Sequence, residues 1–244
     1  MHTPYDLTPP FFEFGPKAYL YGDALLELAL EIDRVAIEFD VDVLLTPQPM
    51  DIPLLAEKLQ RVRVYAQHMD PLPVGRGLGA ILPEAVKAAG AEGVMLNHAE
   101  KPLSMPDIEK TIRRADEVGL ATIVCADTVE DVARIAAMGP NIIVAEPTAL
   151  IGSGQTSDQN YVRQTIETVQ SVNPDIMVLQ GAGISCGQDV YEVMAQGAQA
   201  TGCTSGIILA SDPAAMAREM LSALRTAWAA TQKTNQRKEL THAS

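Results

Sequence analysis

Residues 121–145 read ATIVCADTVEDVARIAAMGPNIIVA, and this stretch decides the fold class. It opens with an apolar run at 121–125 and closes with a second at 142–145, each of the length of a buried strand. Between them, Asp127 and Asp131 suit the start of a helix, and Gly139 stands just past its end, where a left-handed residue often closes a helix. A strand, a helix and a second strand in this order predict a parallel βαβ unit.

The same alternation of strands and helices continues in both directions along the chain. Ile108, Ile112 and Ala115 fall at i, i+4 and i+7, which gives their helix one apolar face toward a sheet. The predicted strands cover residues 11–15, 41–46, 62–67, 93–97, 121–125, 142–145, 176–180 and 199–203. A helical pattern follows each of them, so the sequence predicts an α/β protein with a parallel sheet.

Two architectures suit such a sheet, an open doubly wound sheet and a closed (β/α)8 barrel. Eight units in 244 residues favour the barrel. No Gly-x-Gly-x-x-Gly motif follows the first strand, which argues against a dinucleotide-binding protein. No linker or composition break divides the chain. We therefore expect a single-domain barrel at 11–230, an N-terminal extension at 1–10 and a polar C-terminal tail at 231–244.

Several helix ends carry their own signals. Ser104 precedes Asp107 by three residues in a capping-box pattern, and Asp212 followed by Pro213 indicates an N-cap and a first helical residue. Glycines expected to close helices stand at positions 90, 119, 139 and 197. The last strand could be placed at 207–211 instead of 199–203, but the earlier position leaves Asp212 at the start of the final helix, and we prefer it.

Composition and charge exclude several classes of protein. The net charge of −13 argues against a nucleic-acid partner, and no apolar run approaches the roughly 18 residues of a membrane helix. The first residues do not resemble a signal peptide. Cys125, Cys186 and Cys203 are odd in number and lack CxxC spacing, so we expect no disulfide framework, no metal site and a cytoplasmic location.

Candidate functional residues lie where the predicted strands end, because the active site of such a barrel lies at the carboxyl ends of its strands. Polar candidates there are Lys17, Gln67, His68, Asn97, His98 and Glu146, and glycine-rich turns lie at 152–154, 181–183 and 205–206. Any of these alone is more often structural, and we expect His68 to orient a loop. Together, a carboxylate, an imidazole and an ammonium suit proton abstraction beside a carbonyl, and the glycine turns can bind a phosphate through backbone N–H groups.

Several segments together resemble the triosephosphate isomerase family in its short, archaeal-type form. They are EPTALIGSG at 146–154, LNHAE at 96–100, YAQHMDP at 65–71, LPEAV at 82–86 and GAGIS at 181–185. The resemblance covers about residues 12–224, and the segments at 146–154 and 96–100 are the specific ones. It implies an aldose–ketose isomerase that interconverts glyceraldehyde 3-phosphate and dihydroxyacetone phosphate through an enediolate, a step of glycolysis and gluconeogenesis.

The resemblance also implies a role for individual residues. Glu146 is the general base, His98 polarises the carbonyl, and Lys17 supports the developing charge with Glu100 as its partner. The implied substrate- and phosphate-binding positions are Gly15, Lys17, Ile151, Gly152, Gly183, Thr204 and Ser205. The family needs no metal or cofactor and forms homodimers or homotetramers through the loop that here reads GRGLG at 75–79.

The chain departs from the family at two active-site positions. Gly15 and Pro16 precede Lys17 where the family has Asn-x-Lys, and Ala99 replaces the serine after the histidine. Three alternatives stay open. They are the same chemistry on another short phosphosugar such as a tetrulose phosphate, an aldolase with Lys17 as Schiff base, and a phosphosugar-binding barrel without turnover.

Overall fold

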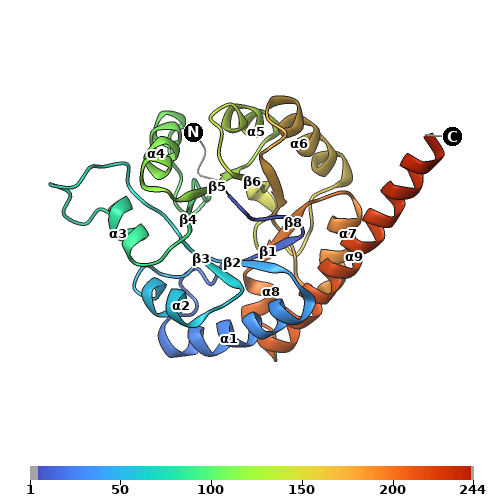
Figure 1. The fold of residues 1–244 in the computed structure, drawn as a ribbon, viewed down its shortest axis with the longest axis horizontal. Helices are drawn as coiled ribbons and strands as arrows, with labels where there is room; N and C mark the ends of the chain where they lie inside the picture. Colours follow the sequence, from blue (N-terminus) through green and yellow to red (C-terminus); the bar gives the residue numbers. More distant parts are fainter. Residues whose placement is uncertain (1–4, 243–244) are drawn as a thin grey trace.

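The computed structural model describes residues 5–242, with side chains described as far as residue 233. Among these residues, eight parallel strands form a closed barrel in which each strand pairs with the next and the last pairs with the first (Figure 1). The strands are β1 (Phe11–Phe14), β2 (Asp42–Leu45), β3 (Val62–Ala66), β4 (Gly93–Leu96), β5 (Ala121–Ala126), β6 (Ile142–Ala145), β7 (Met177–Gln180) and β8 (Ala200–Cys203). Every predicted strand lies within one residue of the observed bounds, and the predicted barrel is confirmed.

Helices follow the strands and surround the barrel (Figure 1). They are α1 (Gly22–Phe39), α2 (Ile52–Lys58), α3 (Pro83–Ala88), α4 (Met105–Val118), α5 (Val129–Ala136), the 3-10 turn η1 (Thr148–Leu150), α6 (Gln159–Val172), α7 (Gly187–Ala195), α8 (Ser205–Ile208) and α9 (Pro213–His242). Within residues 5–242, none of the helices is long and apolar enough to cross a membrane.

The predicted helix ends are confirmed. The Ser104 hydroxyl accepts the Asp107 backbone N–H at 3.3 Å, and Asp212 Oδ1 accepts the Ala215 N–H at 3.0 Å. The four glycines predicted to close helices all have positive φ: they are Gly90, Gly119, Gly139 and Gly197. The chain enters α8 directly after β8, so the last strand lies at the earlier of its two predicted positions.

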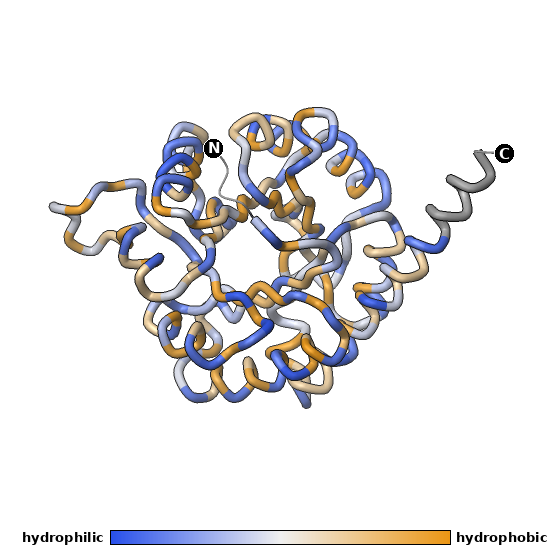
Figure 2. The backbone as a smooth tube through the Cα atoms, in the orientation of Figure 1, coloured by the Kyte–Doolittle hydropathy of each residue, from blue (hydrophilic) through white to orange (hydrophobic). Residues whose placement is uncertain are grey.

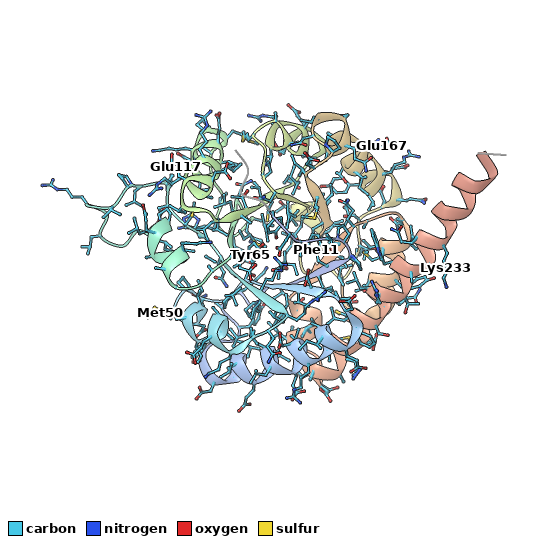
Figure 3. All side chains as sticks on the ribbon, viewed as in Figure 1. Phe11, Met50, Tyr65, Glu117, Glu167 and Lys233 are labelled. Atoms are coloured by element: carbon cyan, nitrogen blue, oxygen red, sulfur yellow. The ribbon has the colours of Figure 1, made fainter. Side chains whose placement is uncertain are left out.

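Apolar side chains form two cores, one inside the barrel and one between barrel and helices. Along β1, Phe11 belongs to the inner core and Phe12 to the outer one, as the alternation of a strand requires. Figure 3 shows Phe11 and Tyr65 near the middle of the barrel and Glu167 at its periphery. In Figure 2 the helices carry hydrophobic and hydrophilic stretches in turn, consistent with one face packed on the barrel.

The amino-terminal ends of the strands are closed by the segment before β1, which crosses the barrel in Figure 1. Leu7 is buried in the inner core, and the Tyr5 hydroxyl hydrogen-bonds to that of Tyr65. Asp6 and Arg63 form an ion pair of 2.6 Å beside them. The open end of the barrel is therefore the carboxyl end, where the candidate residues lie.

The last helix packs along the side of the barrel against α1 and α7 (Figure 1). Arg218 on α9 donates to Glu38 Oε1 of α1 at 2.8 Å, and its guanidinium lies 5.4 Å from the centre of the Phe39 ring. The backbone of α9 is helical to His242. The division of the chain at residues 10 and 230 stays a prediction.

Candidate active site

A cavity of about 880 Å³ opens at the carboxyl ends of the strands. Every residue that the sequence assigned to catalysis or binding contributes to its lining: Gly15, Lys17, His98, Glu100, Glu146, Ile151, Gly152, Gly183, Thr204 and Ser205. These residues follow β1, β4, β6, β7 and β8, so the closed sheet brings together segments that lie far apart in the sequence. A cavity of this size accommodates a small ligand.

Hydrogen bonds to its carbonyl oxygen and an ion pair with its ammonium group fix the position of Lys17. Its φ of 48° lies in the left-handed region, which is unfavourable for a residue with a side chain. The amide groups of Gln48 and Gln67 donate to the Lys17 carbonyl oxygen at 3.1 and 2.9 Å and support this conformation. At the other end of the residue, Lys17 Nζ donates to Glu100 Oε1 at 2.6 Å. The ammonium therefore faces the cavity as a fixed positive charge.

The hydrogen bonds of His98 define which ring nitrogen carries its proton. The Glu100 backbone N–H donates to His98 Nδ1 at 3.1 Å, so the proton of the neutral ring is on Nε2. Burial lowers the pKa of His98, and the positive charge of Lys17 lowers it further. His98 is thus a neutral imidazole with an N–H donor at Nε2, and it lines the cavity.

Glu146 follows β6 and lies opposite His98. The distance between Glu146 Oε2 and His98 Nε2 is 3.9 Å, which is too long for a hydrogen bond. Burial raises the pKa of Glu146, whereas Lys17 and a hydrogen bond from the Ala182 backbone lower it. A carboxyl group with a raised pKa beside a neutral imidazole is suited to accept a proton near neutral pH.

The backbone of the turn after β7 fits closely against Glu146 and against the segment 147–156, which we call the lid segment. A β-carbon on Gly181 would lie 3.0 Å from Glu146 Oε1, and one on Gly183 would lie 1.9 Å from the Gln155 carbonyl oxygen. Gly183 also has a φ of +73°. Glycine at both positions therefore lets the turn approach the carboxylate on one side and the lid segment on the other.

The start of the lid segment is fixed by Asp127, whose Oδ1 accepts the Thr148 backbone N–H at 2.7 Å. The Tyr161 hydroxyl donates to the Asp127 carbonyl oxygen at 2.8 Å. The sequence predicts Asp127 to be an acidic residue at the start of a helix, but its side chain instead binds the lid segment. Thr128 is the N-cap of α5, and Asp131 is the acidic residue of its first turn, as predicted.

One part of the cavity is lined by the lid segment, by the turn after β7 and by the start of α8. Gly152 in the lid segment has a φ of 71°, and Thr204 precedes the first turn of α8. The Cys203 thiol donates to the Ile184 carbonyl oxygen at 3.1 Å and joins the turns after β7 and β8. Exposed N–H groups of such turns can hold an anion without lysine side chains.

The other polar candidates have structural roles. Gln67 also donates to the Thr46 carbonyl oxygen at 2.9 Å, and Asn97 bridges Cys125 and the Leu103 N–H. His68 Nε2 lies 3.2 Å from Asp70 Oδ1, and Asp70 accepts the Ile81 N–H at 2.7 Å. The prediction that His68 orients a loop is consistent with these contacts, although His68 also lines the cavity.

Sequence reasoning missed Glu13, which lies inside the barrel and lines the cavity. Thr46 Oγ1 donates to Glu13 Oε1 at 2.9 Å. The signal was available, because a central strand of a parallel barrel normally consists of apolar residues and Glu13 interrupts the run at 11–14. An acidic residue in such a strand indicates a polar interior position.

The geometry suits proton transfer at a carbon next to a carbonyl. Glu146 can accept the proton, His98 can donate to the carbonyl oxygen, and the charge of Lys17 can stabilise an enediolate. Lys17 Nζ lies 2.6 Å from Glu100 Oε1, and this ion pair does not favour a role as a Schiff-base nucleophile. Among the described residues, no cluster of His, Cys, Asp or Glu is arranged to hold a metal ion.

Comparison with known proteins is consistent with this geometry. The family model of triosephosphate isomerase matches residues 17–218. A triosephosphate isomerase of Methanothermus fervidus is 38% identical over 82% of this chain and 91% of its own length. The enzyme of Methanobacterium bryantii is 39% identical over 81% of this chain and 89% of its own. The enzyme of Saccharolobus solfataricus is 33% identical over 90% of this chain and 98% of its own length.

Proposed function

Because this chain belongs to the triosephosphate isomerase family, we propose that it interconverts glyceraldehyde 3-phosphate and dihydroxyacetone phosphate, a reaction of glycolysis and gluconeogenesis. The observation that carries the proposal is the approach of Glu146 to His98 in a cavity that also holds Lys17. These three groups are those that an enediolate mechanism requires, and the reaction needs no further cofactor.

We assign the chemical steps as follows. The Glu146 carboxylate takes a proton from the carbon next to the carbonyl, while the His98 Nε2–H donates a hydrogen bond to the carbonyl oxygen. The resulting enediolate carries negative charge, which the Lys17 ammonium offsets. His98 moves the proton of the neighbouring hydroxyl group to the former carbonyl oxygen, and Glu146 returns its proton to the former carbonyl carbon, which converts the aldose to the ketose. Glu100 holds Lys17 in position through their 2.6 Å contact.

We assign phosphate binding to the backbone turns on the β6–β8 side of the cavity. Ile151, Gly152, Gly183, Thr204 and Ser205 line this part of the cavity, and none of them carries a charged side chain. The Ile151 N–H already donates to the Thr148 carbonyl oxygen at 3.3 Å, so we assign the N–H donors to the other four residues. A local arrangement of this kind can bind an anion although the chain carries a net charge of −13. Gly15 and Lys17 line the cavity beside the reacting part of the sugar.

The lid segment excludes water from the reaction in this proposal. Its contacts with Asp127 and Gly183 support closure over the mouth of the cavity. Closure strengthens the electrostatic interactions inside and protects an enediolate that would otherwise lose phosphate.

A homodimer or homotetramer is the expected assembly, formed through the loop between β3 and α3. This loop projects from the barrel in Figure 1. Val74 is 70% exposed and Leu78 is fully exposed, so two large apolar side chains face solvent in the single chain. Light scattering after gel filtration measures the assembly directly. Leu78→Lys is expected to weaken it, and a monomeric wild-type protein would contradict this proposal.

A cytoplasmic location is supported by the cysteines. Cys125, Cys186 and Cys203 are all free thiols, and Cys125 and Cys203 are buried. Unpaired thiols suit a reducing compartment.

An isomerase assay on a panel of phosphorylated trioses and tetroses tests the function. We expect the highest kcat/KM with the two triose phosphates. A higher kcat/KM with a tetrulose phosphate would indicate the same chemistry on a longer sugar. No observation in the structure favours that alternative. Binding of phosphosugars without turnover on any of them would contradict the assignment as an enzyme.

A further inference from the structure

An acidic side chain lies in the middle of the first barrel strand, and the mechanism above does not use it. Phe12 and Phe14 on either side of Glu13 pack in the outer core, and Phe11 packs in the inner one. The alternation along β1 therefore turns Glu13 into the barrel. There it lines the floor of the cavity and keeps part of its surface open to it.

The Glu13 carboxyl fills space that two glycines leave free. Glu13 Oε1 lies 2.9 Å from the position that a β-carbon on Gly15 would take, and Oε2 lies 2.9 Å from that of Gly202. The asparagine side chain that the family places at Gly15 could not fit here unless Glu13 moved. The carboxyl group thus takes the place of the missing amide beside Lys17.

One oxygen of the carboxyl group has a fixed partner, and the other is available to a ligand. Thr46 Oγ1 donates to Oε1 at 2.9 Å. Thr46 is itself buried, so this contact fixes the orientation of the carboxyl group. Oε2 makes no hydrogen bond with any residue that the structure describes, and the carboxyl group borders the cavity. The geometry therefore leaves Oε2 of a cavity-lining carboxyl group without a partner among the described residues.

Burial inside the barrel favours the neutral form of the Glu13 carboxyl group. Burial raises the pKa of Glu13 to about 7, the Thr46 hydrogen bond lowers it, the charge of Glu146 raises it and that of Lys17 lowers it. The remaining titratable groups that face it are Cys125 and Cys203, whose pKa values burial raises above the ordinary thiol range. An anionic phosphosugar adds negative charge and favours protonation further.

We propose that Glu13 acts as a neutral carboxylic acid whose O–H donates a hydrogen bond to a substrate oxygen at the reacting end of the phosphosugar. This role rests on the proposed isomerase function. The donor would stabilise the oxygen charge that develops in the enediolate, in addition to His98. An ionised Glu13 would instead repel that charge, so deprotonation should abolish its contribution.

The test compares the pH profiles of kcat/KM for the wild type, Glu13→Gln and Glu13→Ala. Glutamine keeps the shape and an N–H donor at all pH values, whereas alanine removes both. The wild type is expected to lose activity as the pH rises through the pKa of Glu13, because kcat/KM reports the free enzyme. In Glu13→Gln this alkaline loss disappears and most of the neutral activity is kept, while Glu13→Ala is expected to fall by at least about tenfold across the range.

A second variant and a control separate this role from a structural one. Thr46→Val removes the hydrogen bond that lowers the Glu13 pKa, so the alkaline loss should move to higher pH. Glu57→Gln makes the same substitution at an exposed site on α2 and should leave the profile unchanged. The substrate phosphate titrates near pH 6 in every case, so the differences between variants belong to the protein.

Three outcomes would overturn the role of Glu13 and leave the isomerase function intact. They are an alkaline loss of kcat/KM that persists in Glu13→Gln, a wild-type pH profile that is flat through neutral pH, and full activity in Glu13→Ala. A wild type without isomerase activity would contradict the proposed function, and this inference with it.

Discussion

Gly181→Ala places a methyl group directly against the proposed base. The added β-carbon would lie 3.0 Å from Glu146 Oε1 and 3.1 Å from its Cδ, whereas ordinary contacts begin near 3.4 Å. Gly181 does not have a positive φ, so alanine can adopt its backbone conformation. The substitution therefore acts on the position of one carboxylate.

The size of the effect follows from this overlap. The carboxylate must yield by about 0.4 Å, the difference between the 3.0 Å contact and the 3.4 Å limit. A displacement of about 1 Å from the reactive geometry costs roughly 100-fold in rate. Scaled to the smaller shift, the expected fall in kcat is about sixfold, or about 1 kcal/mol in the activation free energy.

Steady-state kinetics of the triose phosphate isomerisation measure this effect. We expect kcat to fall while KM changes little, because the methyl group does not reach the phosphate-binding turns. Gly187→Ala is the matched control, since its β-carbon would lie 2.8 Å from the Glu219 side chain, outside the cavity. An unchanged kcat in Gly181→Ala, or an equal loss in Gly187→Ala, would refute the argument that the position of Glu146 limits the rate.

Three further predictions concern pH dependence and stability. Burial raises the pKa of Glu146, and Glu146 must be ionised to act as the base. We therefore expect kcat/KM to fall as the pH drops through a value above the ordinary carboxyl pKa of 4.5. A constant kcat/KM down to pH 4.5 would contradict this prediction. Glu100 raises the pKa of Glu146 by its charge, so Glu100→Gln should move this acid limb to lower pH, and an unmoved limb would show that the two groups are not coupled. Ser104→Ala removes the N-cap of α4 and should cost about 1 kcal/mol in the free energy of unfolding, or about 2–4 °C in Tm, with kcat unchanged. An unaltered Tm in a thermal unfolding scan would count against that capping contribution.

The strands were predictable because each is a short apolar run bounded by turn residues. Residues 142–145 are apolar throughout and lie in the barrel as β6, and the glycines that close helices stand where the backbone must turn left-handed. The convergence of Lys17, His98 and Glu146 followed from one rule, that parallel strands of a barrel end on the same side.

The interior polar contacts were not predictable in the same way. The interruption of an apolar strand marks Glu13 as a polar interior residue, but its partner Thr46 lies 33 residues away and could not be identified from that signal. Asp127 has the sequence signature of a helix start, yet its side chain holds Thr148 of the lid segment. Contacts of this kind depend on the register between strands and on the path of the loops, which no local pattern specifies.

The most direct test of the central claim follows the carbon-bound hydrogen of dihydroxyacetone phosphate by proton NMR in deuterated water, with the wild type and with Glu146→Gln. If Glu146 moves the proton, the wild type forms glyceraldehyde 3-phosphate and introduces solvent deuterium at carbon. Glu146→Gln, which keeps the shape of the side chain but cannot accept a proton, should lose both conversion and exchange by at least about 100-fold. Conversion and exchange at the wild-type rate in Glu146→Gln would contradict the assignment of Glu146 as the base.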